Sequence, residues 1–68
     1  MNPEANVRIL WQQLPSALTD NELSALIMYA CGGCQQAEIA RALGVTQAGV
    51  SYLLHSVVKK GKVIADAL

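Results

Sequence analysis

The sequence predicts a small all-α protein, a four-helix bundle that contains a helix-turn-helix, with the C-terminal tail as a candidate fifth element. Apolar residues recur at three- and four-residue spacing in four segments, as on the buried face of an amphipathic helix. Capping residues and glycines separate these segments. A chain of 68 residues has room for one domain, which we expect to span residues 1–68.

The first helix is predicted to start at Asn2, Pro3 and Glu4, a cap, a first-turn proline and an acid near the positive end of the helix dipole. We expect it to end before Pro15, because the residue before a proline disfavours the helical conformation. A connector over residues 14–18 should follow. The apolar face of this helix comprises Val7, Leu10, Trp11 and Leu14.

The second helix should begin at Thr19, where Glu22 completes a capping box. Its apolar stripe continues to Ala30, and Gly32 and Gly33 should stop it.

The helix-turn-helix is predicted over residues 35–60, as a helix from 35 to 43, a tight turn and a helix from 47 to about 59. Small Ala40 allows the two helices to approach, Gly44 supplies a positive φ, and Thr46 is a good cap for the second helix. We expect Gly61 to close that helix. The apolar tail, residues 62–68, could form a last helical turn, a strand across a dimer or a frayed end.

Charge is distributed unevenly along a chain whose formal net charge is zero. Residues 1–34 carry one positive and three negative side chains, a net of −2, whereas residues 35–68 carry four positive and two negative ones, a net of +2. The basic half coincides with the helix-turn-helix, as a nucleic-acid footprint should. Because the chain has so few cations, DNA binding would depend on dimerisation or on cooperation between sites.

Composition points to a partner as well. Apolar residues make up 53% of the chain and charged residues only 15%, in a protein that is short for burying much of its surface. A homodimer is the simplest symmetric assembly that would cover apolar side chains which the monomer cannot bury. No apolar run approaches the length of a membrane span, and the N-terminus lacks signal-peptide features, so we expect a cytoplasmic location.

Residues 32–33, 43–51 and 55 read Gly-Gly, Leu-Gly-Val-Thr-Gln-Ala-Gly-Val-Ser and His. They resemble one group of bacterial regulators, the fimbrial (adhesin) operon regulators and the related plasmid repressors of the Trf/Kor type. Residues 38–40 and 43–45 also resemble the LuxR-type DNA-binding domain. The chain departs from that family at Ser51, where a basic residue usually stands, and in the low basic density of its reading helix. Both resemblances imply a helix-turn-helix regulator that binds repeated DNA sites as a dimer.

The predicted function is therefore sequence-specific binding of double-stranded DNA by a homodimeric transcriptional regulator, with the helix from residue 47 in the major groove. Glutamine, serine and tyrosine side chains can bond base edges or phosphates, and an alanine methyl group can meet thymine. Base or groove contacts are predicted for Gln47, Ala48, Ser51, Tyr52 and His55. Phosphate contacts are predicted for Arg41, Thr46, Lys59, Lys60 and Lys62. A dimer interface is predicted for Trp11, Leu14, Val63 and Ile64, from the first helix and the tail.

Other functions receive less support. Cys31 and Cys34 form a CxxC pair that could be redox-active or supply half of a zinc site shared between subunits, but small buried thiols beside a glycine turn are the favoured interpretation. No paired carboxylates, phosphate-binding glycine loop or oriented histidine indicates catalysis, and no cofactor or small-molecule ligand is expected. The main alternative is a protein-interaction module, such as an anti-repressor or adaptor, on the same fold without DNA binding.

Overall fold

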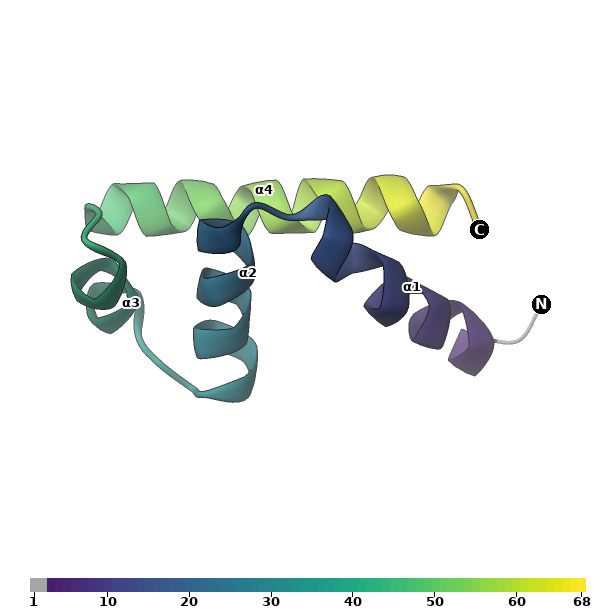
Figure 1. The fold of residues 1–68 in the computed structure, drawn as a ribbon, viewed down its shortest axis with the longest axis horizontal. Helices are drawn as coiled ribbons and strands as arrows, with labels where there is room; N and C mark the ends of the chain where they lie inside the picture. The colour runs from purple at the N-terminus through teal and green to yellow at the C-terminus, as the bar shows by residue number, and fades with distance from the viewer. Residues whose placement is uncertain (1–2) are drawn as a thin grey trace.

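A computed structural model describes residues 3–68, and the side chains from residue 5 onward. Over this range the chain forms the helices α1 (Pro3–Ala17), α2 (Asp20–Leu26), η1 (Ile27–Cys31), α3 (Gln36–Leu43) and α4 (Gln47–Asp66), and no strand. The all-α architecture predicted from the sequence is confirmed. Figure 1 shows α4 running along the length of the molecule, with the other helices on one side of it.

Local sequence explains most helix ends. Thr19 caps α2 through the predicted box: its Oγ1 accepts from the Glu22 backbone N–H at 3.2 Å, and Glu22 Oε1 accepts from the Thr19 N–H at 2.9 Å. Gly44 ends α3 at a φ of 69°, in the left-handed region that only glycine enters cheaply. Thr46 caps α4, where its Oγ1 accepts from the Gly49 N–H at 3.0 Å.

Two predicted helix ends are wrong, that of the first helix and that of the last. The first helix does not stop before Pro15 but continues to Ala17, so the predicted connector is largely helical. A proline in the last turn costs α1 only one backbone hydrogen bond near an end where carbonyls lack partners anyway. The predicted Asn2 cap lies outside the described residues.

The last helix does not stop at Lys59 but runs through Gly61 to Asp66, so most of the ambiguous tail is the end of α4. Gly61 lies against Leu14, because a Cβ built on it would be 3.9 Å from Leu14 Cδ1. Helix packing therefore overrides the weak helix propensity of glycine. The tail adds no separate element.

The second predicted helix consists of two parts. From Ile27 to Cys31 it widens into the π-helical turn η1, in which the Gly32 N–H donates to the Ile27 carbonyl at 3.0 Å. Gly33, at a φ of 64°, then turns the chain toward α3.

The core lies between α2, α3 and the first half of α4. Its buried residues are Ala25, Ile39, Ala40 and Val50. The half-buried side chains packed around them are Met28, Cys34, Leu43, Val45, Leu53 and Leu54. α1 lies outside this core and packs extensively only on α4. The molecule is consequently elongated, at 40 × 19 × 15 Å.

Candidate nucleic-acid interface

The first half of α4 packs against α3 through its buried side. Ile39 and Ala40 on α3 and Val50 on α4 are buried in the same core, and the Val45 N–H donates to the Ala40 carbonyl at 3.0 Å across the turn. Gly49 permits a close approach of the turn, since a Cβ there would lie 3.2 Å from Thr46 Oγ1. These contacts hold the start of α4 in one orientation relative to α3.

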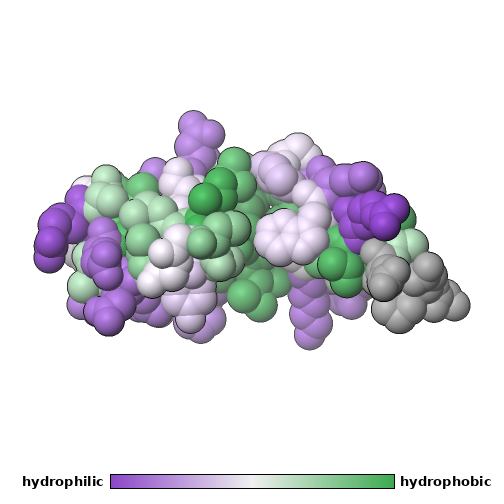
Figure 2. Space-filling view, turned by 90° about the horizontal axis from the view of Figure 1, so that it is seen from below, coloured by the Kyte–Doolittle hydropathy of each residue, from purple (hydrophilic) through white to green (hydrophobic). Residues whose placement is uncertain are grey.

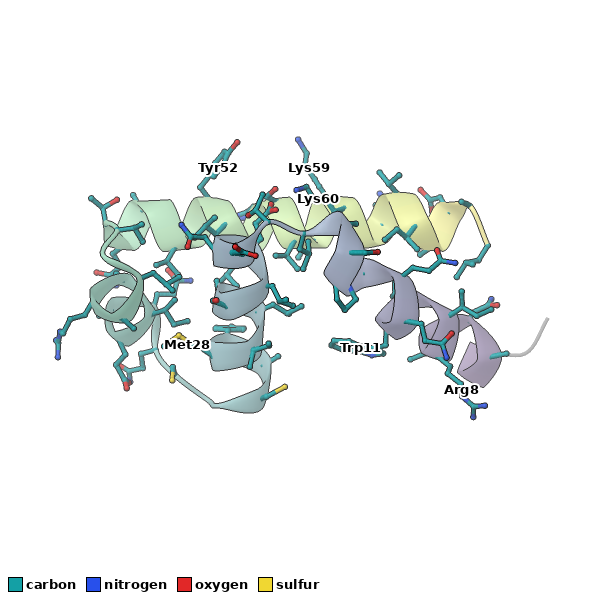
Figure 3. All side chains as sticks on the ribbon, in the orientation of Figure 1. Arg8, Trp11, Met28, Tyr52, Lys59 and Lys60 are labelled. Atoms are coloured by element: carbon teal, nitrogen blue, oxygen red, sulfur yellow. The ribbon has the colours of Figure 1, made fainter. Side chains whose placement is uncertain are left out.

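The opposite side of α4 is free of other helices. Ala48, Tyr52, His55, Lys59 and Lys62 are exposed and follow one another at three- and four-residue spacing, which places them on one stripe. Tyr52 is 74% exposed, and in Figure 3 its side chain points away from the rest of the molecule, as does that of Lys59.

Three of the predicted groove residues, Ala48, Tyr52 and His55, thus share this stripe. Gln47 is exposed at the first turn of α4, and Ser51 is half-buried beside the stripe. His55 Nδ1 lies 2.8 Å from the Ser51 carbonyl oxygen, which can only accept, so Nδ1 donates in this hydrogen bond. The hydroxyl groups of Ser51 and Tyr52 can each donate or accept. The face therefore presents both donors and acceptors.

Lys60 is engaged elsewhere. Its Nζ lies 2.5 Å from Glu22 Oε1, and the Ser56 hydroxyl donates to the other oxygen of the same carboxylate. Lys60 therefore forms an ion pair with Glu22 of α2 in place of the phosphate contact predicted for it. The cations that remain exposed among the predicted phosphate residues are Arg41, Lys59 and Lys62, and Thr46 uses its side chain as the α4 cap.

From the sequence, Glu22 was predicted only as part of the capping box of α2. It is 4% exposed, yet it accepts hydrogen bonds from Thr19, Ser56 and Lys60. The bonds from Lys60 and then Ser56 lower the pKa of Glu22 from 4.5 to about 2, against the opposing effect of burial. This cluster fixes the start of α2 to the middle of α4. The sequence offered no signal for it, because Glu22 and Lys60 are distant along the chain.

A shallow hollow adjoins the exposed face of α4. Its volume is about 220 Å³, and it is lined by Tyr29, Gln36, Ser51, Leu54, His55 and Val58. Tyr29 comes from the π-helical turn η1 and is half exposed. Tyr29 and Gln36 were not predicted as site residues, since their position next to Ser51 and His55 depends on how η1 and α3 pack against α4.

The predicted dimer residues do not form one surface. Leu14 is buried within the chain at 6% exposure, in contact range of Gly61, so it belongs to the α1–α4 contact and not to a free interface. Ile64 is half-buried and Val63 is 70% exposed, and both line a shallow hollow with Ala17. Trp11 is 52% exposed and extends from α1 toward the side of α2 in Figure 3.

The cysteines are free thiols, with Cys31 exposed and Cys34 half-buried against the core. Within residues 3–68, no three histidine, cysteine or acidic side chains lie close enough together to hold a metal ion. None of the described helices combines the length and apolar character needed to cross a bilayer.

Neither a protein-family model, nor a characterised protein, nor a solved structure matches this chain.

Proposed function

We propose that this chain is a transcriptional regulator that binds double-stranded DNA sequence-specifically as a homodimer in the cytoplasm, with the first half of α4 in the major groove. The observation that carries the proposal is the exposed stripe of α4, which begins with Ala48 and continues through Tyr52 and His55, with Gln47 exposed beside it in the first turn. A helix free along one side and packed firmly along the other fits the width of the major groove. Support for a helix-turn-helix comes from the tight turn at Gly44, where α3 ends and the Val45 N–H bonds back to the Ala40 carbonyl before α4 begins.

The exposed cations of the basic half support this assignment. Lys59 and Lys62 continue the stripe, and exposed Arg41 lies on α3, the helix that would cross the DNA backbone. Three cations per subunit give six per dimer, which predicts a slope of about −5 for the logarithm of affinity against the logarithm of salt concentration. Base contacts by Gln47, Ser51, Tyr52 and His55 would then supply specificity.

Selection from a pool of random duplex DNA at two salt concentrations tests the proposal. We expect enrichment of a two-fold-repeated site, because a homodimer presents two α4 helices related by symmetry. Binding without enrichment would replace specific regulation by general DNA coating. Absence of binding at low salt would remove the DNA proposal altogether.

Single-residue variants then locate the contacts. Gln47→Ala should lose about tenfold in affinity for the selected site and relax discrimination at one base pair, because Gln47 would no longer bond a base edge. A selected sequence that is unchanged for Gln47→Ala would mean that another part of the chain reads the DNA.

Two neighbouring lysines provide a matched pair for the phosphate contacts. Lys59→Ala should weaken binding to all sequences alike and reduce the salt slope by about 1. Lys60→Ala should leave the salt slope unchanged and instead lower the thermal stability, because Lys60 is bound to Glu22. Equal salt slopes for the two variants would contradict this division of roles.

A second candidate function is protein interaction through the same face. The exposed side of α4 also carries apolar groups, since Tyr52 and Val58 are 74% and 69% exposed. A module that binds a regulator protein and not DNA would use them as contact area. Failure to bind any duplex, together with an intact fold, would favour this function.

A further inference from the structure

The apolar face of α1 is only partly covered. This face, which we call the α1 stripe, consists of Val7, Leu10, Trp11 and Leu14. Leu14 is buried and Leu10 is half-buried, but Val7 and Trp11 are each 52% exposed. The difference follows from the path of α1, which meets α4 near its own C-terminal end and diverges from it toward its N-terminus (Figure 1).

The segment of α2 and η1 also has an exposed apolar side chain. Trp11 extends from α1 toward α2 (Figure 3), and Ile27, at the junction of α2 and η1, is 51% exposed. Seen from below in Figure 2, apolar residues gather over the middle of this face. The two helices make little contact with each other across it.

The exposed area of the chain is larger than a compact monomer of this mass requires. It amounts to 4742 Å² for 7.2 kDa, whereas a folded monomer of that mass exposes about 4,100 Å². The radius of gyration, 12.7 Å, likewise exceeds the roughly 11 Å of a compact domain of this length. The excess of about 600 Å² approaches the roughly 800 Å² that each partner buries in a standard protein interface.

Charge indicates what kind of partner fits. Arg8 is the only charged residue among residues 5–17, and it lies outside the α1 stripe. A helix that lies on a lipid surface carries several basic residues on its polar face, which α1 lacks. An apolar face without charges can instead pair with an identical face, since no like charges meet around the two-fold axis.

We propose that a second copy of this chain covers the α1 stripe, with Trp11 of each copy at the centre of the interface. This inference rests on one part of the proposed function, the homodimer, and identifies the surface through which the two copies associate. It does not require DNA binding. It keeps Trp11 from the predicted interface and leaves out Val63 on α4. Two α1 helices on one side then leave the exposed stripe of both α4 helices free.

Trp11 is the only tryptophan in the chain, so the unmodified protein reports on this contact. Sedimentation equilibrium should show a monomer–dimer equilibrium, and the tryptophan emission maximum should shift to shorter wavelength over the same concentration range. Both are measured without DNA. A protein that remains monomeric at 100 times the concentration used for DNA binding would overturn the proposal, as would a dimer whose emission does not shift on association.

Two variants and one control locate the surface. Trp11→Ala should raise the dimer dissociation constant about 30-fold or more, the effect of truncating a central aromatic residue. Val7→Ala, one turn away, should raise it by a smaller factor. Val63→Ala removes an equally apolar and more exposed side chain from α4 and should leave the constant unchanged. Circular dichroism confirms that each variant is helical.

The outcomes separate this inference from the proposed function. Loss of dimer in Trp11→Ala with retained weak binding to half-sites supports both. A dimer that forms normally but binds no DNA supports the α1 interface and removes the DNA function. An unchanged dissociation constant for both Trp11→Ala and Val7→Ala, or a larger effect of Val63→Ala, overturns the interface whatever the DNA result.

Discussion

The two halves of α4 have different surroundings. Its first half packs against both α2 and α3, and Val50 there is fully buried. Its second half packs against the end of α1 and is tied to α2 through Lys60 and Glu22, and Val58 and Val63 remain about 70% exposed. The first region closes its own core, whereas the second leaves apolar surface open. One long helix thus has two roles. Its first half is part of the core shared with α2 and α3, and its second half packs against α1, which has no core of its own.

This comparison predicts that stability depends mainly on the first region. Ile39→Ala should lower the free energy of unfolding by about 3 kcal/mol, because it leaves a cavity where the side chain is fully buried. A domain of this size has about 3–10 kcal/mol in total, so this loss is roughly a third of its stability or more. Urea denaturation followed by circular dichroism measures the change.

Val58→Ala is the matched control, because it truncates a residue that is 69% exposed on α4. Its effect should stay within about 0.5 kcal/mol. Equal losses for Ile39→Ala and Val58→Ala would mean that the second region has a core of its own in solution.

The Glu22 cluster lies where the two regions meet, and it should have the next largest effect. Glu22→Gln should destabilise the chain by about 2 kcal/mol, because Lys60 and Ser56 lose a charged acceptor in a nearly buried site. This loss of stability is smaller than for a fully buried ion pair, because the Lys60 side chain is 37% exposed. Thermal unfolding at pH 7 measures it, and Asp20→Asn at an exposed position of the same helical turn is the control.

The pH dependence of stability gives an independent test of the same cluster. The pKa of Glu22 is lowered on folding from 4.5 to about 2, so its contribution is fully present above pH 5 and is lost as the pH falls toward 2. The stability difference between the wild type and Glu22→Gln should therefore shrink progressively below pH 4.5. A difference that stays constant down to pH 2 would show that Glu22 has an ordinary pKa.

The sequence predicted those features that depend on a few neighbouring residues. The capping box of Thr19 and Glu22, the positive φ of Gly44 and the Thr46 cap each involve residues within one helical turn, and the structure contains all three. The shared stripe of Ala48, Tyr52 and His55 follows in the same way from helical periodicity.

Features that depend on distant contacts were missed. The partnership of Lys60 with Glu22 joins two helices that local patterns place independently. The π-helical turn η1, which brings Tyr29 beside the face of α4, has no recognisable sequence signal. The divergence of α1, which leaves Trp11 exposed while Leu14 is buried, likewise depends on the angle at which two helices meet.

Gly61 provides the smallest predicted effect and the one most specific to the second region. It lies inside α4 and carries no positive φ, so an alanine can adopt the same backbone conformation. The added Cβ would meet Leu14 Cδ1 at 3.9 Å, an ordinary van der Waals contact. Gly61→Ala should therefore stabilise the chain by about 0.5–1 kcal/mol, through higher helix propensity and a less flexible unfolded chain.

The position of Gly61 makes this variant informative about α4 as a whole. If the second half of α4 frays at this glycine in solution, the alanine should also increase the helical circular dichroism signal of the folded protein. If α4 is continuous to Asp66 in the folded protein, the signal should stay constant while the unfolding midpoint rises. Gly44→Ala is the contrasting control, because a φ of 69° strains any side chain, and it should destabilise by about 1 kcal/mol. A destabilised Gly61→Ala would mean that α1 and α4 pack more closely than the contact with Leu14 implies.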